Sequence, residues 1–205
     1  MQDSRLAELV AMIEGWPGLV SGPASPLIGD SLVLADHLGD ARRLVDVGSG
    51  GGLPGLPLKI VHPDLEVTLI EADQAKAAFL VQAAARLVLR DVEVVTMRAE
   101  DAGHDRRYRE SFDVAVARAL APLPTLVELC LPLVRVGGRL LAQKTEKEGT
   151  ARAERAIEVL GGLLEPALPA PSAARESGIV VIVRKVRPTP AEYPRRPGVP
   201  ARKPL

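Results

Sequence analysis

A glycine-rich stretch at residues 44–55 constrains the fold of this 205-residue chain more than any other feature. It begins with a short apolar run, 44–47, that has the length and the β-branched content of a buried strand. Its glycine cluster leads, after Pro54, into a helix-like segment. A strand, a glycine-rich turn and a helix together form a corner in which backbone N–H groups face a bound ligand.

Two glycine patterns overlap in this stretch. Gly50, Gly52 and Gly55 match G-x-G-x-x-G, which alone is a weak indication of a dinucleotide. Asp46, Gly48, Gly50 and Gly52 match the more specific D-x-G-x-G-x-G. An acid at position 46 would repel a pyrophosphate but suits a ligand with cationic ammonium and sulfonium groups. The sequence therefore favours S-adenosylmethionine, with Asp46 and the loop at its methionine end.

The next strand supplies a second acid. Residues 67–71 are strand-like and end in Glu71, about 20 residues after the glycine loop, where a ribose partner is expected. We therefore expect Glu71 to bind both ribose hydroxyls of the cofactor. The alternative is that Asp46 and Glu71 merely terminate strands.

Hydrophobic periodicity predicts an α/β fold. Strands are expected at 43–47, 66–71, 92–96, 112–117, 139–143, 163–168 and 178–186, and helices at 5–14, 26–37, 54–61, 74–89, 124–134 and 146–160. Strands alternating with helices indicate a seven-stranded, mostly parallel sheet with helices on both faces. We expect one domain over 1–205, with capping helices in 1–40, the core in 41–186 and a basic, proline-rich tail in 187–205.

Ligands on such sheets bind beyond the carboxyl ends of the strands. The candidate residues at those ends are Asp46, Glu71, the 98–101 turn and Arg118. Ala99 and Glu100 offer a backbone N–H and a carboxylate for an adenine. Arg118 suits a carboxylate, a phosphate or a guanine edge, and the alternative for it is a surface salt bridge.

Composition excludes several classes of protein. No apolar run reaches the ~18–20 residues of a membrane span, and the N-terminus lacks a signal-peptide pattern. The single cysteine, Cys130, excludes an internal disulfide and suits a reducing cytoplasm, which is the location we expect. The three histidines show no metal-ligand spacing with it, so we expect no metal.

Charge is concentrated at the C-terminal end, although the formal net charge of the chain is zero. Residues 184–205 hold seven Lys or Arg residues and one acid, which suits either phosphate contact or a solvated tail. Aromatic residues are scarce, which argues against a base-stacking platform.

The residues that are absent near the glycine loop indicate which kind of methyl acceptor this site could use. No His or Lys lies by the loop as a general base, and Cys130 lacks the Pro-Cys context of enzymes that attack a pyrimidine. Strand 112–117 is not followed by the Asn/Asp-Pro-Pro-Tyr/Phe signature of exocyclic-amine methylation. An acceptor that is already nucleophilic, such as guanine N7, needs only alignment and electrostatic help.

These motifs resemble a known family. Residues 44–58, Arg98-Ala-Glu100, Ala117-Arg-Ala119, Leu141-Ala-Gln-Lys144 and the tail 188–205 look like the bacterial RsmG family, also called glucose-inhibited division protein B. The resemblance covers about 29–205. It implies the Rossmann-like fold of class I S-adenosylmethionine-dependent methyltransferases. It also implies methyl transfer from S-adenosylmethionine to N7 of a guanosine in 16S ribosomal RNA. By resemblance, Gly48 and Leu53 contact the cofactor at the loop, Ala99 and Glu100 at the adenine, and Arg118 near the methyl.

The resemblance also implies a partner and shows departures. The partner is 16S RNA or the 30S particle, the expected protein state is a monomer, and the RNA-facing residues are Lys144, Arg195, Arg196, Arg202 and Lys203. The family's Arg-His pair before Asp-Ser-Leu is replaced by Pro26 and Leu27, and a second one near the last strand by Ser177-Gly178. Alternatives are another RNA or a small molecule as substrate, a non-catalytic ribosome-assembly factor, and, last, a dinucleotide oxidoreductase.

Overall fold

A mixed β-sheet forms the middle of the computed structural model, which describes residues 2–205 and their side chains from Ser4 onward. Its strands are β1 (Arg43–Val47), β2 (Glu66–Glu71), β3 (Val92–Thr96), β4 (Phe112–Arg118), β5 (Val134–Thr145), β6 (Gly162–Leu164), β7 (Leu168–Pro169) and β8 (Gly178–Lys185). Their order is β3-β2-β1-β4-β5-β8-β6, with β7 paired to β8. Strands β1 to β5 pair in parallel, whereas β8 runs antiparallel to β5, β6 and β7.

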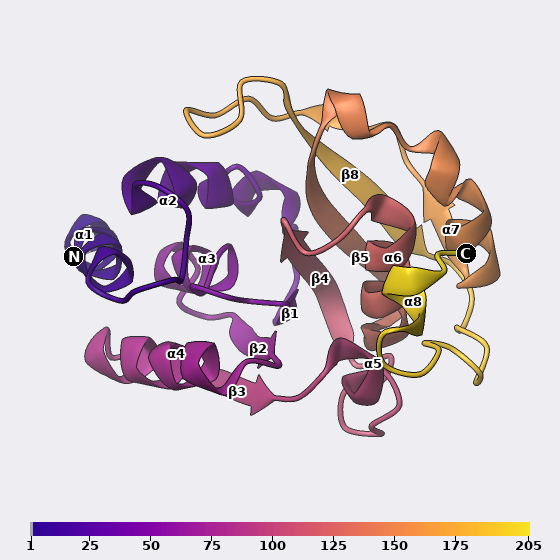
Figure 1. Cartoon of the computed structure of the whole chain (residues 1–205), viewed down its shortest axis with the longest axis horizontal. Coiled ribbons are helices and arrows are strands. Elements are labelled where there is room, and N and C mark those ends of the chain that lie inside the picture. The colour runs from indigo at the N-terminus through magenta and orange to yellow at the C-terminus, as the bar shows by residue number, and fades with distance from the viewer. Residues whose placement is uncertain (1) are drawn as a thin grey trace.

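Helices cover both faces of the sheet, as Figure 1 shows. They are α1 (Gln2–Glu14), α2 (Ala24–Leu32), α3 (Gly55–Val61), α4 (Gln74–Arg86), α5 (Ala99–Ala102), α6 (Leu123–Cys130), α7 (Glu154–Val159) and α8 (Val199–Arg202), with short 3-10 turns η1 (Ala35–His37), η2 (Leu131–Leu133), η3 (Glu146–Glu148) and η4 (Ala151–Ala153). The first four α-helices share one hydrophobic core with the sheet, and α6 and α7 share the other.

Strand β1 lies inside the sheet, between two other strands, and carries buried apolar side chains on both of its faces. Val45 and Val47 belong to one core and Leu44 to the other, and all three side chains are fully buried. Strands β2 and β4 flank β1, so the order of the strands reverses there. This reversal opens a crevice at the carboxyl ends of β1 and β4, which is where a doubly wound sheet binds its ligand.

Most expected elements are confirmed, with differences at their ends. The sheet has an eighth short strand, β7, and β5 begins at Val134, with a register irregularity opposite β4. The helix expected at 146–160 is continuous only over 154–159, because Gly149 adopts a left-handed φ of 61° between two 3-10 turns. The expected helix 26–37 divides into α2 and η1, and α5 is an addition to the expected elements. None of the helices within residues 2–205 is long and apolar enough to cross a membrane.

The end of α4 carries backbone strain. The N–H of Val88 donates to Ala85 O (3.1 Å) and that of Leu89 to Ala84 O (2.9 Å), which is the Schellman arrangement. This arrangement places Val88 at a left-handed φ of 52°, a conformation that disfavours a β-branched residue. Its side chain is 69% exposed, so its removal loses little packing.

We expect Val88→Gly to raise the free energy of unfolding by about 1 kcal/mol in urea denaturation, because glycine adopts this conformation without strain. Val81→Gly is the matched control, since Val81 is also exposed but lies inside α4. Glycine there should lower the free energy of unfolding by about 1 kcal/mol. Equal destabilisation by the two changes would contradict strain at Val88.

Candidate functional site

The glycine loop after β1 adopts a conformation that requires glycine. Gly48, Gly50 and Gly52 have left-handed φ values of 71°, 54° and 81°. A Cβ atom on Gly48 would lie 2.4 Å from Leu120, and one on Gly52 would lie 2.3 Å from Leu56. Both strain and space therefore exclude side chains, and the loop backbone is left open toward the crevice.

Asp46 supports this loop from beneath. Its side chain is fully buried, and its Oδ2 accepts a hydrogen bond of 2.9 Å from the N–H of Gly55, the first residue of α3. A Cβ atom on Gly55 would lie only 2.8 Å from that oxygen, so the last glycine of the pattern allows this close approach. Burial raises the pKa of Asp46 to about 7, although the Gly55 hydrogen bond and the charge of Arg118 lower it.

The raised pKa makes stability depend on pH. Below about pH 4 Asp46 is protonated in both states, whereas between pH 4 and about 7 the unfolded state releases the proton and the folded state retains it. This group's contribution to stability is therefore lost as the pH rises through that window. An asparagine at this position would keep an acceptor for the N–H of Gly55 without the charge.

We accordingly expect the advantage of Asp46→Asn over the natural protein, measured by urea denaturation without cofactor, to grow by a few kcal/mol between pH 4 and pH 8. Asp113→Asn is the control. Burial raises the pKa of Asp113, but hydrogen bonds from Arg43 N–H and Arg135 outweigh burial and lower it. The stability lost with its charge should therefore be nearly constant between pH 4 and pH 8 and should diminish only below about pH 4. If the stability difference between Asp46→Asn and the natural protein did not change with pH, a raised pKa at Asp46 would be contradicted.

Glu71 lies at the end of β2 and faces the same loop. Its Oε2 accepts a hydrogen bond of 2.8 Å from the N–H of Gly50, and its Oε1 accepts one of 2.8 Å from the N–H of Asp73. These bonds fix the carboxylate between the glycine loop and the start of α4. Each oxygen retains a lone pair for a further donor, such as a ribose hydroxyl.

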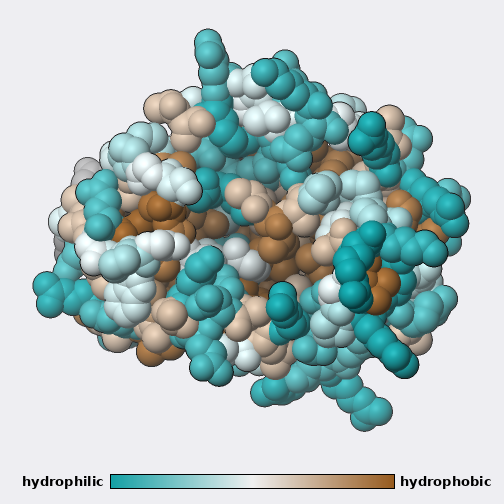
Figure 2. Space-filling model, in the orientation of Figure 1, coloured by the Kyte–Doolittle hydropathy of each residue, from teal (hydrophilic) through white to brown (hydrophobic). Residues whose placement is uncertain are grey.

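A cavity of about 460 Å³ opens at this edge of the sheet. The predicted site residues that line it are Gly48, Gly50, Leu53, Glu71, Ala99, Glu100 and Arg118. Asp46 and Gly52 are not among the described residues that line it. Sequence reasoning missed the walls formed by Leu19 and Val20, by Thr125 and Leu129 on α6, and by Gly198 and Ala201 at α8. Figure 2 shows apolar surface in the middle of this face of the molecule, with hydrophilic side chains around it.

Arg118 ends β4 and lines the cavity. Its Nε atom is buried without a hydrogen-bond partner among the described residues. Burial lowers the pKa of its guanidinium, whereas the charges of Asp30 and Asp46 raise it. The next residue, Ala119, has a left-handed φ of 52°, so the chain turns sharply at the point where Arg118 leaves the sheet. Such strain is often concentrated at functional sites.

The C-terminal segment, residues 187–205, is packed against α5 and α6. The N–H of Gly198 donates to Glu100 Oε1 (2.8 Å), and Thr125 Oγ1 donates to Pro200 O (3.0 Å). The guanidinium of Arg195 forms an ion pair with Glu128, which is fully buried. The segment thereby holds Gly198 and Ala201 at the cavity.

Two of the five residues expected to face RNA form contacts within the protein. Lys144 is 5% exposed, and its Nζ donates to Ala121 O (2.6 Å) and to Glu148 Oε2 (2.7 Å). Arg195 is engaged by Glu128, because a fully buried carboxylate requires a counter-charge. Both residues thus have partners within the protein, and their contact with RNA stays a prediction. Arg196, Arg202 and Lys203 have exposed side chains.

Other candidate chemistry is limited. Cys130 is fully buried on α6, and burial raises the pKa of its thiol, so it is not a ready nucleophile. Among the side chains that the structure describes, from Ser4 onward, no group of His, Cys, Asp and Glu is arranged to hold a metal ion. A second cavity of about 570 Å³ lies at the opposite edge of the sheet, between residues 38–42 and 61–66, away from the glycine loop.

Comparison with known proteins identifies relatives over most of the chain. Residues 25–165 match the model of the GidB family, described as rRNA small subunit methyltransferase G. The Ribosomal RNA small subunit methyltransferase G of Roseiflexus castenholzii is 51% identical over 86% of this chain and 76% of that protein. The protein of the same name from Moorella thermoacetica is 48% identical, over 85% of this chain and 74% of its own length.

Solved structures share the fold at lower identity. The T. thermophilus 16S rRNA methyltransferase RsmC, solved in complex with AdoMet and guanosine, superposes with a TM-score of 0.56 at 18% identity. The match covers 79% of this chain and 40% of that protein. At this identity the likeness concerns the fold.

Proposed function

Because the chain belongs to the rRNA small subunit methyltransferase G family, we propose that it transfers a methyl group from S-adenosylmethionine to N7 of a guanosine in 16S ribosomal RNA. The observation that carries this proposal is the cavity at the carboxyl ends of the strands. It brings the glycine loop, Glu71 and Arg118 together around one volume.

The residues around this cavity fit S-adenosylmethionine. Gly48 and Gly50 line the cavity with backbone in a left-handed conformation and without side chains, which suits the close approach of the methionine end of the cofactor. Glu71 offers both carboxylate oxygens to the ribose hydroxyls. Ala99 and Met97 line the side on which an adenine would lie. Glu100 is 7% exposed and already accepts from Gly198, so its part is to hold the wall beside the adenine.

The chain contributes orientation and charge to the reaction. The cofactor, when bound, supplies an electrophilic methyl group on a sulfonium sulfur. Guanine N7 has a free lone pair, so the chain needs no side chain to remove a proton from it. Arg118 donates to the guanine edge or to a phosphate and so aligns N7 with the methyl. The fully buried Asp46, below the loop, gives a negative potential in its ionised form, and a cationic ligand would stabilise that form.

Exposed basic residues support contact with RNA. Arg196, Arg202 and Lys203 lie on the C-terminal segment, whose Gly198 and Ala201 border the cavity. Phosphate contacts here would position a target nucleotide over the pocket. We infer that the substrate is the RNA or the 30S particle and that the protein acts as a monomer.

Labelled-methyl transfer tests the reaction. The purified protein is incubated with labelled S-adenosylmethionine and either 16S RNA or 30S particles from a strain that lacks its own enzyme. The labelled RNA is then digested and its modified nucleoside identified. We expect 7-methylguanosine, and the more strongly labelled substrate shows whether RNA or the assembled particle is preferred. Another methylated nucleoside would contradict the N7 assignment.

One observation supports a second candidate function. Pro26 and Leu27 stand where the family has an Arg-His pair, and they lie on α2. If that pair normally contacts RNA, this chain acts on another substrate or only assists ribosome assembly. S-adenosylmethionine binding without transfer to either 16S substrate would favour this candidate.

A further inference from the structure

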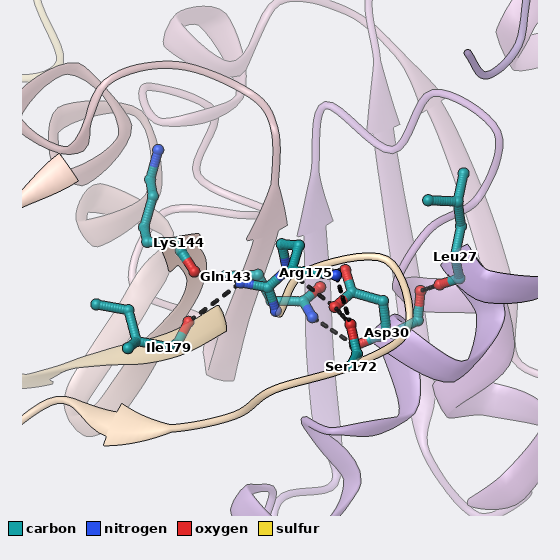
Figure 3. Close-up of polar contacts among 8 residues, drawn as sticks. Leu27, Asp30, Gln143, Lys144, Ser172, Arg175 and Ile179 are labelled. Atoms are coloured by element: carbon teal, nitrogen blue, oxygen red, sulfur yellow. Dashed lines mark hydrogen bonds and ion pairs between the residues drawn. The ribbon is translucent and has the colours of Figure 1, made fainter. Parts of the chain in front are cut away.

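A buried polar cluster lies beside Arg118, outside the residues that line the cavity. Its centre is Asp30 on α2, whose side chain is fully buried. Figure 3 shows Arg175 and Ser172 approaching Asp30 from the loop before β8, and Gln143 approaching from β5. The cluster therefore joins three segments that are far apart in the sequence.

Asp30 is held through both its carboxylate and its backbone. Arg175 Nε donates to Oδ1 (2.8 Å) and Oδ2 (3.0 Å), and Ser172 Oγ donates to Oδ1 (2.6 Å). The backbone carbonyl of Asp30 accepts a hydrogen bond of 2.6 Å from Gln143 Nε2. Arg175 Nη1 also donates to the carbonyl of Lys144, a residue of β5.

The register of the sheet connects this cluster to Arg118. Gln143 on β5 is the direct partner of Arg118 on β4, so the two side chains project from the same face on neighbouring strands. Asp30, bound by Gln143, thus lies on the face toward which Arg118 projects. The negative charge of Asp30 favours the charged form of the Arg118 guanidinium, whereas the positive charge of Arg175 disfavours it.

The cluster is also where hydrogen bonding is incomplete. Within the described residues, four buried side-chain polar atoms lack a partner, namely Asp46 Oδ1, Arg118 Nε, Gln143 Oε1 and Arg175 Nη2. Buried polar atoms without partners are rare, and these four belong to Arg118 itself and to the groups around it. Such an arrangement is suited to a group that takes up a new partner when a substrate binds.

We propose that Asp30 is a positioning residue for Arg118. Arg175 and Ser172 hold the Asp30 carboxylate in place, and its negative charge orients the guanidinium of Arg118 toward the target nucleotide. This inference rests on the proposed function, because it assigns to Arg118 a partner during methyl transfer. It makes helix α2 a part of the reactive site. The cofactor-binding side, at the glycine loop and Glu71, does not depend on Asp30.

The test is a double-mutant cycle of Asp30→Asn with Arg118→Lys. The asparagine keeps the shape and the backbone carbonyl that Gln143 binds, but removes the charge. We expect Asp30→Asn to lower kcat for RNA methylation roughly 10- to 100-fold, as misplacement of a reacting group does. The Kd for S-adenosylmethionine and the KM for RNA should change less than about twofold, within the error of additivity. With lysine at position 118, the same change at Asp30 should have almost no further effect on kcat.

The matched control is Asp113→Asn at the other end of β4. Asp113 likewise accepts from an arginine, Arg135 Nε (2.6 Å), and from backbone N–H groups, but at the edge of the sheet away from the cavity. It should alter stability and leave kcat unchanged. If Asp30→Asn does not fold, Arg175→Lys takes its place in the cycle, since it loses the two-oxygen contact and keeps the charge.

The outcomes separate this inference from the proposed function. No methyl transfer by the natural protein would contradict the proposed function itself. Transfer by the natural protein with an unchanged kcat in Asp30→Asn would overturn the positioning role. Additive effects of the two substitutions on kcat would also overturn it, because Asp30 would then act independently of Arg118.

Discussion

Glu71→Ala is expected to raise the Kd for S-adenosylmethionine by at least about 100-fold in isothermal titration. Two hydrogen bonds from ribose hydroxyls to a carboxylate contribute about 1.5–3 kcal/mol each, and both are lost. The N–H of Gly50 would lose its acceptor as well, which loosens the glycine loop at the methionine end. Glu71→Gln should have a smaller effect, because its amide retains one acceptor oxygen.

Asp73→Ala is the matched control for this change. Asp73 is an acid two residues further along, and its side chain caps α4 by accepting from Ala75 and Lys76 N–H groups. Its loss should cost about 1 kcal/mol of unfolding free energy and leave the cofactor Kd nearly unchanged. If both variants bind S-adenosylmethionine as tightly as the natural protein, the ribose role of Glu71 is wrong.

Arg195→Ala is expected to lower the free energy of unfolding by about 3–5 kcal/mol, because it leaves the fully buried carboxylate of Glu128 without its counter-charge. The three hydrogen bonds between the two residues include two from the guanidinium, at 2.8 and 2.5 Å. The released segment would also withdraw Gly198 and Ala201 from the cavity. We therefore expect the S-adenosylmethionine Kd to rise roughly tenfold in the folded fraction.

The neighbouring residue provides the control. The side chain of Arg196 is exposed, and among the described residues its guanidinium forms no ion pair. Arg196→Ala should leave stability within about 0.5 kcal/mol and weaken RNA binding, with a shallower dependence on salt. Urea denaturation and RNA titration at several salt concentrations distinguish the two. Equal loss of stability in both variants would show that the Glu128 ion pair is not what holds the segment.

The sequence alone was enough to predict the fold and the side of the candidate site that contains the glycine loop and Glu71. Strands β1 to β4 have runs of apolar residues with clear ends, and the glycine pattern with Glu71 has a spacing that few other arrangements require. These signals are local, so they can be read without knowing the rest of the structure. For the same reason Ala99 and Arg118, which follow or end a strand, could be placed at the edge where the cavity lies.

The parts that could not be predicted depend on contacts between distant segments. Nothing near Arg195 in the sequence indicates that Glu128, on α6, is buried and needs a positive partner. A run of basic residues has the same composition whether its members pair internally or face RNA, so sequence alone does not separate Arg195 from Arg196. The Asp30–Arg175 pair spans 145 positions, and only the folded chain shows that these residues meet.

The docked C-terminal segment has a consequence for the order in which the protein matures. A ribosome synthesises a chain from its N-terminal side, so the glycine loop, Glu71 and Arg118 emerge well before Gly198 and Ala201. The wall that these last two residues form is added after the rest of the pocket has been synthesised. A nascent chain therefore contains every strand of the sheet before it contains the residues that complete the wall of this cavity.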